Sequence, residues 1–243
     1  MRLRQSVTTG SDLSSVYFAP LTGTALEARE IKSLFPEARV LLQEQATKAS
    51  LKQTVAPRIL HIATHGFFLE DRPVRIECTR GLSLLRDDGD LGESNVDVKI
   101  ENPLLRSGLA LAGANLRMGR EDDGILTALE ASGLNLWGTK LVVLSACDTG
   151  VGVARTGEGV YGLRRALVLA GSETQVMSLW PVNDYVTQRL MKAYYAGLKQ
   201  GQGRGEALRS VKLEMMRQKG TEHPFYWASF IQSGMWTELD DQR

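Results

Sequence analysis

Residues 141–150 read L-V-V-L-S-A-C-D-T-G, an apolar run that ends in small and polar residues. A continuous run of Val and Leu is typical of a strand that is buried on both faces of a parallel sheet. Cys147 comes where this strand is expected to end, and ligands of open α/β sheets bind at that carboxyl edge. The stretch therefore predicts an α/β fold with a cysteine at the functional edge of its sheet.

A second stretch has the same layout, because residues 59–66 read I-L-H-I-A-T-H-G and end in His65 and a glycine. If both strands end at one edge of the sheet, His65 and Cys147 make a candidate base and nucleophile. Taken alone, a free cysteine is more often a small buried apolar residue, and a single histidine is more often structural. We interpret His61, inside the run, as a core histidine whose hydrogen bonds are satisfied.

The composition limits the class of protein. The chain has 243 residues, of which 43% are hydrophobic, and a net charge of +1. One domain is expected at this length, and so small a charge provides no field to attract nucleic acid or a membrane. An apolar run of about 18 residues, as a membrane span requires, is missing, and the start has no apolar signal segment. Only Cys78 and Cys147 are present, so we expect reduced thiols in a cytoplasmic protein.

The order of the remaining elements favours a parallel sheet with crossover helices. A capping box at Thr24 and Glu27 predicts a helix that Pro36 ends, and Thr47 is expected to cap a short helix before the histidine strand. We expect strands at residues 38–42 and 174–180, helices at about 159–170, 186–199 and 205–218, a helix after a second capping box at 127–130, and a final extended segment from 223 to 236.

Residues 69–102 are different in composition, because Asp, Glu, Arg and Gly dominate them. A loop of this length inside a compact domain is usually functional or disordered. We interpret it as a mobile lid over the substrate groove, which a partner would have to move. Residues 102–115 are small and apolar and are expected to return as a strand or flap, and residues 1–16 to be disordered or a linker.

Three other chemistries do not fit the spacing. A phosphatase loop needs a cysteine and an arginine at a fixed separation, and Val153 stands at the arginine position. Residues 157–162 match G-x-G-x-x-G, but a dinucleotide-binding fingerprint follows directly on a strand, which is not expected here. Cys78 and Cys147 lack metal-ligand spacing with the histidines. We therefore expect no metal and no cofactor.

Taken together, these motifs resemble a known family. A-T-H-G at 63–66 and L-S-A-C-D-T-G at 144–150 look like the histidine and cysteine motifs of the CHAT domain. This is a caspase-like domain that is often joined to arrays of tetratricopeptide repeats (TPRs). The resemblance runs in the family's order from about residue 17 to residue 236, so it covers nearly the whole chain. Further stretches that agree lie at 107–113, 123–130, 157–163, 177–184 and 223–230.

The resemblance implies a caspase-like three-layer α/β/α sandwich with a mainly parallel central sheet, formed as a single domain by residues 1–243 within a longer TPR-containing protein. It also implies a cysteine endopeptidase that cleaves a protein or peptide substrate and is regulated by TPR or sensor domains of its own or a partner chain. Cys147 would be the nucleophile and His65 the general base, and the amides of Gly66 and Cys147 would form the oxyanion hole. From the resemblance we expect the strand region usual before Pro20 to be absent or shortened.

Three acidic residues are candidates for substrate binding. They are Asp148, Glu158 and Asp184, which follow the central strands in the sequence. We therefore expect them to surround the pocket for the residue before the scissile bond. At the position of Asp148 the family commonly has glutamate. Buried carboxylates would select Arg or Lys there, although the same acids can also be solvated or cap helices. A second class of function is a caspase-like scaffold with an idle dyad that only binds partners. The presence of both Cys147 and His65 favours the peptidase.

Overall fold

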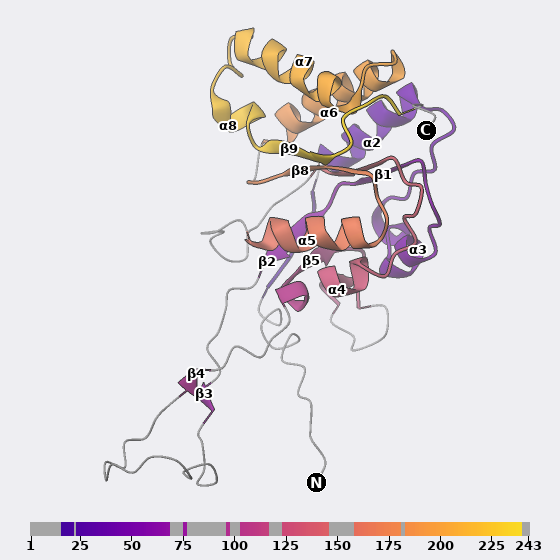
Figure 1. The fold of residues 1–243 in the computed structure, drawn as a ribbon, viewed down its shortest axis with the longest axis vertical. Helices are drawn as coiled ribbons and strands as arrows, with labels where there is room; N and C mark the ends of the chain where they lie inside the picture. Colours follow the sequence, from indigo (N-terminus) through magenta and orange to yellow (C-terminus); the bar gives the residue numbers. More distant parts are fainter. Residues whose placement is uncertain are drawn as a thin grey trace.

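The computed structural model describes residues 16–21, 23–68, 75–76, 96–97, 103–116, 123–145, 158–180 and 183–239. Its centre is a four-stranded sheet in the order β1-β7-β8-β9, and helices cover both faces of this sheet (Figure 1). The three-layer α/β/α arrangement expected from the resemblance is therefore confirmed. The strands are β1 (Ile59–Ile62), β7 (Leu141–Leu144), β8 (Thr174–Ser178) and β9 (Phe230–Gly234).

The sheet is mainly parallel, as predicted. β7 lies between β1 and β8 and is parallel to both, while β9 is antiparallel to β8. Every residue of β7 and β8 is buried, which is what strands covered on both faces require. Ile62 pairs with Leu144 at the carboxyl ends of their strands, so the two stretches expected to carry the site are direct neighbours.

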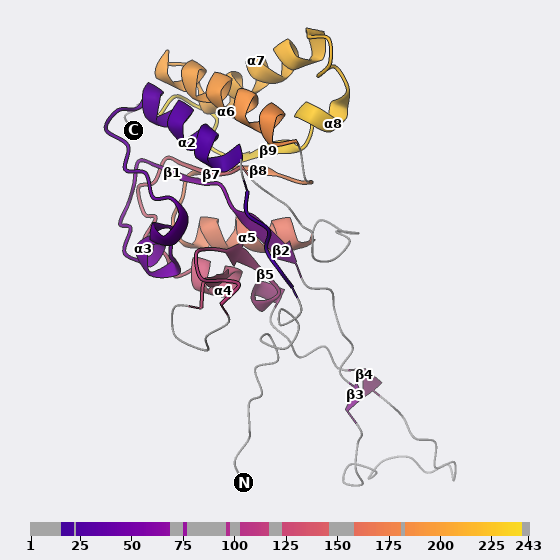
Figure 2. The same cartoon turned by 180° about the vertical axis from the view of Figure 1, so that it is seen from behind.

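The helices form one layer on each side of the sheet (Figures 1 and 2). Leu141 and Val143 of β7 pack in one buried apolar cluster, and Val142 and Leu144 pack in the other, because successive side chains of a strand point to opposite faces. One layer holds α2 (Gly23–Leu34), α6 (Asp184–Lys199), α7 (Arg204–Arg217) and α8 (Pro224–Trp227), and the other holds α3 (Lys48–Lys52), α4 (Ala128–Ala131) and α5 (Glu158–Leu169).

His65 lies in a second, smaller sheet. Our expectation that it ends the same strand as His61 is wrong, because β1 stops at Ile62 and the chain turns before His65 pairs with Ala110. The hydroxyl of Thr64, in that turn, donates to the Ala110 carbonyl and so helps to direct the chain into the second sheet. This sheet is antiparallel and contains β2 (His65–Phe68), β5 (Ser107–Ala110) and β6 (Ile125–Thr127). The remaining elements are the pair β3 (Arg75–Ile76) and β4 (Val96–Asp97) and the 3-10 turns η1 (Gln43–Gln45) and η2 (Pro103–Leu105).

One predicted strand is wrong, and the predicted final extended segment is right only from β9 onward. Residues 38–42 form no strand, and Nζ of Lys32 donates to the carbonyls of Pro36 and Ala38 at 2.6 Å each, which ties this stretch to the end of α2. The segment after His223 is not extended at first, because the His223 side chain caps α8 and Pro224 stands at its first turn. Proline fits that position well, since its missing N–H is not needed there.

The capping box predicted at Thr24 and Glu27 is also wrong. α2 begins at Gly23, so Thr24 already lies inside the first turn, and its hydroxyl donates to the Leu21 carbonyl at 2.9 Å. The Glu27 side chain does not return to the helix end and is buried against the sheet, with 4% of the residue exposed. The same pattern at Thr127 and Glu130 does form a capping box, with both reciprocal hydrogen bonds present.

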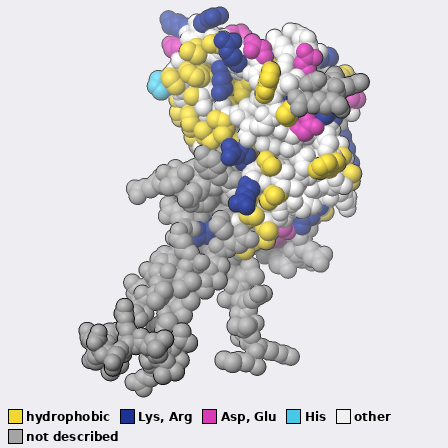
Figure 3. Space-filling model, in the orientation of Figure 1, with side chains coloured by type: hydrophobic (Ala, Val, Ile, Leu, Met, Phe, Trp, Pro, Cys, Tyr) yellow, Lys and Arg dark blue, Asp and Glu magenta, His cyan; other side chains and the backbone are white. Residues whose placement is uncertain are grey.

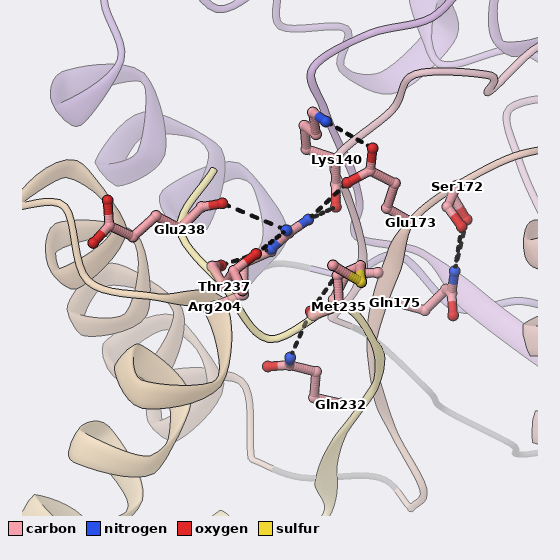
Figure 4. Close-up of polar contacts among 10 residues, drawn as sticks. Lys140, Ser172, Glu173, Gln175, Arg204, Gln232, Met235, Thr237 and Glu238 are labelled. Carbon is pink, nitrogen blue, oxygen red and sulfur yellow. Dashed lines mark hydrogen bonds and ion pairs between the residues drawn. The ribbon is translucent and has the colours of Figure 1, made fainter. Parts of the chain in front are cut away.

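A buried arginine fixes the opposite end of the sheet from the candidate site (Figure 4). Arg204, at the start of α7, donates to the carbonyls of Lys140 and Thr237 at 2.7 and 3.0 Å. Glu173 lies 3.4 Å from the same guanidinium and 2.7 Å from Nζ of Lys140. Lys140 and Glu173 directly precede β7 and β8. This network therefore joins the amino ends of two central strands to the last described residues, which is a structural role.

The surface carries charges of both signs. On the face shown in Figure 3, Lys and Arg side chains are interspersed with Asp and Glu, and hydrophobic side chains gather over α7 and α8. Met216 and Phe225 are each 45% exposed. This face therefore has no field of a single sign, which agrees with the small net charge of the chain.

Glu130 links α3 to α4 through ion pairs. Nζ of Lys48, which is buried, lies 2.8 Å from Oε1 of Glu130 and 3.0 Å from Oδ1 of Asp123. Lys52 adds a second contact to Glu130 at 2.9 Å. Burial alone would raise the pKa of Glu130, but hydrogen bonds from Lys48, Lys52 and Thr127 outweigh it and lower this pKa to about 2.

We expect acid to weaken the fold through Glu130. Its pKa is lower in the folded state, so its stabilisation is complete above about pH 4.5 and is lost as the pH falls toward 2. Its side chain is 31% exposed, and solvent screening reduces the contribution to about 1 kcal/mol at neutral pH. Glu130→Gln should lower the free energy of urea unfolding by about 1 kcal/mol at pH 7 and by much less near pH 3. Glu206→Gln, on the surface of α7, is the control, and equal losses in the two variants at both pH values would contradict the assignment.

Candidate active site

The candidate site begins where β1 and β7 end side by side. Beyond the last pair of the two strands, the Ser145 N–H donates to the Ile62 carbonyl at 3.1 Å and extends the ladder by one residue. His65 follows Ile62 by three residues, and in the sequence Cys147 follows Leu144 by three. Cys147 itself lies outside the described residues, so the histidine side of the predicted dyad is the one that the structure describes.

His65 is buried at the first position of β2, with 6% of the residue exposed. Its Nε2 lies 2.5 Å from the backbone carbonyl oxygen of Ala19, and its ring lies 5.8 Å from that of Phe18 between centroids. A carbonyl oxygen can only accept a hydrogen bond, so Nε2 must carry the hydrogen, and in the neutral ring the lone pair is on Nδ1. The contact therefore makes Nδ1 the atom that accepts a proton when this histidine acts as a base.

The segment that supplies Ala19 is held in place by Asn115. The N–H of Phe18 donates to Oδ1 of Asn115 at 3.0 Å, and Nδ2 of Asn115 donates back to the Phe18 carbonyl at 2.9 Å. The sequence analysis missed Phe18, Ala19 and Asn115, because a backbone carbonyl and one asparagine carry no pattern. The only feature of the sequence that sets this segment apart is the short apolar group at residues 16–19. Of residues 1–16, expected to be disordered or a linker, residues 1–15 lie outside the described residues.

Gly66 is also placed by the structure. It is buried in β2 opposite Leu109, directly after His65. A Cβ at this position would meet its nearest neighbour, the Gly108 carbonyl oxygen, at 3.8 Å, an ordinary contact distance. The packing of the second sheet therefore does not by itself require glycine at position 66.

The three acidic residues predicted to bind substrate are described unequally. Asp184 is exposed in the first turn of α6, and its Oδ2 accepts a hydrogen bond from the Gly23 N–H at 3.3 Å. Asn183, and not Asp184, caps α6. Glu158 is the first residue of α5, but its side chain and all of Asp148 lie outside the described residues. That these acids form one pocket stays a prediction.

The predicted lid lies largely outside the described residues as well. Within residues 69–102 the structure describes only the antiparallel pairing of β3 with β4, and Cys78 is not included. Among the described residues, no group of three or more His, Cys, Asp or Glu side chains is arranged to hold a metal ion. In the same part of the chain, no helix combines the length and apolar character that crossing a membrane requires.

Comparison with known proteins adds the family. The sequence profile described as "CHAT domain" matches residues 3–235, nearly the whole chain. The chain belongs to the CHAT domain family. The resemblance drawn from the histidine and cysteine motifs is therefore confirmed, and with it the caspase-like character of the fold.

This CHAT domain is also similar to part of two much longer proteins. It is 33% identical over 120 residues to mouse tetratricopeptide repeat protein 28, and 32% identical over 116 residues to the human protein of that name. Each alignment covers 48% of this chain but 5% of the relative. The expected association of CHAT domains with TPR arrays is thus seen in its relatives.

Proposed function

We propose that this CHAT domain is a cysteine endopeptidase in which Cys147 attacks a peptide carbonyl and His65 transfers the proton. The observation that carries the proposal is the state of His65. Its ring is buried just past the end of β1, the neighbour of the strand that leads to Cys147, and Nε2 is held by the Ala19 carbonyl. A general base needs a ring fixed in one orientation and one tautomer, which this contact provides.

The length of chain between the sheet and each residue supports the pairing. Paired neighbouring strands are ~4.8 Å apart, and Ile62 and Leu144 are such a pair. Three residues of chain reach at most ~10 Å, which limits how far His65 and Cys147 can lie from that common edge. Both side chains can thus meet at one substrate carbonyl.

The chemistry follows from the two groups. A free thiol with a pKa of ~8.5 is only a few per cent thiolate at neutral pH, and a neighbouring imidazolium favours the thiolate. The Cys147 thiolate adds to the carbonyl carbon, and the amides of Gly66 and Cys147 would hold the oxyanion. His65 then gives its proton to the leaving amine, which breaks the C–N bond. Water then attacks the thioester carbonyl while His65 takes a proton from the water. The C–S bond breaks, the carboxylic acid leaves, and the Cys147 thiolate is regenerated.

The substrate and control follow from the same proposal. Asp148, Glu158 and Asp184 would line the pocket before the scissile bond and select Arg or Lys, because any other side chain would leave a carboxylate unpaired. TPR or sensor segments would regulate access. The similarity to TPR proteins is equally compatible with a scaffold whose dyad is idle, and this is the second candidate function.

A thiol-directed peptide probe separates the two functions. Peptides that end in Arg, Lys, Asp or Leu with an electrophilic group should label Cys147 fastest when the last residue is Arg or Lys, and the purified chain should cleave matching substrates. The labelled residue is found by peptide mapping, with Cys78→Ala as the control that retains labelling. A preference for Asp or Leu would contradict the acidic pocket, and labelling no faster than that of the unfolded chain would favour the scaffold.

A further inference from the structure

A buried polar cluster lies next to the candidate site on the side of α2. Oε2 of Glu27 accepts a hydrogen bond from Oγ of Ser145 at 3.1 Å. Oε1 of Glu27 lies 3.2 Å from Nε2 of His61 without the alignment of a hydrogen bond. Glu27 and Ser145 are almost completely buried, and the His61 side chain is 15% exposed. A carboxylate in such surroundings needs these partners.

The hydrogen bonds of this cluster run in one direction. A carboxylate only accepts, so Ser145 donates to Glu27, and the serine oxygen accepts from Nε2 of His61 at 3.1 Å. Nδ1 of the neutral ring then accepts from the Tyr195 hydroxyl at 2.9 Å. Burial, together with Tyr194 and Glu27, raises the pKa of Tyr195 well above its ordinary value, so this hydroxyl keeps its proton. The chain of bonds thus connects α6, β1, β7 and α2.

Ser145 is the point where this cluster meets the candidate site. It is the last described residue before Cys147 and stands two positions before it. Its N–H is fixed by the Ile62 carbonyl of β1, and its side chain is fixed by Glu27 and His61. Ser145, the last described residue before Cys147, is therefore held through both its main-chain and its side-chain groups.

The chain just before α2 also contacts His65. Ala19, just before α2, provides the carbonyl that binds Nε2 of His65, and Glu27, within α2, binds Ser145. Ala19 and Glu27, eight positions apart, thus contact His65 itself and Ser145, which directly follows β7. Buried polar side chains are often no more stabilising than apolar residues of similar volume, so stability alone does not explain a buried Glu27 beside Ser145 and His61.

We propose that Glu27 and His61 are positioning residues that hold Ser145 beside the end of β1 and so fix the point from which the chain continues to Cys147. The kinetic consequence rests on the proposed function, whereas the effect on the backbone does not. A variant that loses the carboxylate should loosen the backbone at Ser145 while α2 stays packed on α6.

The test compares Glu27→Gln with Glu30→Gln in a Cys78→Ala background. Glu30 is a matched control, because it lies on the same helix and makes an ion pair of 2.6 Å with Lys192 on the surface. Amide hydrogen exchange of the peptide 141–150 reports how firmly the backbone around Ser145 is held. The rate of Cys147 alkylation against pH reports the fraction of thiolate. Ser145→Ala, a small buried change, repeats the test if Glu27→Gln folds poorly.

We expect Glu27→Gln and Ser145→Ala to increase exchange in 141–150 and to lower kcat on the order of tenfold to a hundredfold, with little change in KM. Alkylation of Cys147 at neutral pH should slow in parallel, and Glu30→Gln should match the parent in all three measurements. A lower melting temperature with unchanged exchange and alkylation would overturn the proposal. A parent chain that cleaves nothing would refute the peptidase alone, because the exchange comparison would still decide the positioning role.

Discussion

Replacing Cys147 by alanine should abolish peptide-bond cleavage and leave the fold intact. The substitution removes the nucleophile, and loss of a nucleophile from a peptidase lowers kcat by more than about 10⁴-fold. The fold should persist, because alanine is also small and apolar, and the buried residues of β7 end before position 147. The measurement is kcat/KM on a substrate identified with the peptide probe, together with a thermal unfolding curve.

Cys78→Ala is the matched control for this experiment. It removes the other cysteine of the chain and should change neither cleavage nor the melting temperature, since it lies in the polar segment away from both motifs. If Cys147→Ala cuts as well as the parent, the peptidase proposal fails and the scaffold takes its place. If both cysteine variants lose activity together, the assignment of the nucleophile to Cys147 is wrong.

The elements that the sequence predicted well are those with a strong local signal. The run of β7 is continuous and apolar, that of β1 is interrupted only by His61, and both are strands of the parallel sheet. The helix predicted at about 159–170 is α5, and Gly171, just after its end, takes a φ of 104°, which suits a glycine at that position. Apolar runs and glycines at helix ends depend on residues that are close in the chain. Such elements can therefore be predicted from a single sequence.

Identical patterns diverged where tertiary contacts competed with local ones. Thr-x-x-Glu forms a capping box at Thr127 and Glu130, but at Thr24 and Glu27 it does not. Glu27 instead reaches Ser145, 118 positions away in the chain, and becomes buried. A pattern of four residues cannot reveal which of two partners a carboxylate will choose, because the competing partner is brought there by the fold.

The reactive side chains of the candidate site could be predicted from the sequence, but the groups that hold them in place could not. His65 was identified from a histidine and glycine after an apolar run, although it belongs to a second sheet. The Ala19 carbonyl that orients it is a main-chain group, which every residue has. The sequence therefore indicates which side chains can react, and the structure adds how one of them is oriented.

Replacing His65 by alanine should reduce turnover about 10²- to 10⁴-fold, the range that a general acid–base group contributes. The reason lies in the Ala19 contact, which keeps the hydrogen on Nε2, so that a proton from the thiol would go to Nδ1. Without the ring, the thiolate also loses its cationic partner, so the pH midpoint for alkylation of Cys147 should rise toward the ~8.5 of a free thiol. Stopped-flow cleavage rates would measure the loss of turnover, and alkylation rates would give the pH midpoint. Both would be measured between pH 5 and 10, with about one measurement per half pH unit.

His223→Asn is the control for the histidine, because asparagine can also cap α8 and the His223 side chain is exposed. It should leave the rate and the alkylation profile as in the parent. A structural role of His65 would lower the melting temperature and reduce the amount of folded protein without moving the alkylation midpoint of the folded fraction. A general base makes the opposite prediction, since the midpoint must move even in a variant that is fully folded. An unchanged midpoint in folded His65→Ala would therefore exclude this histidine as the partner of Cys147.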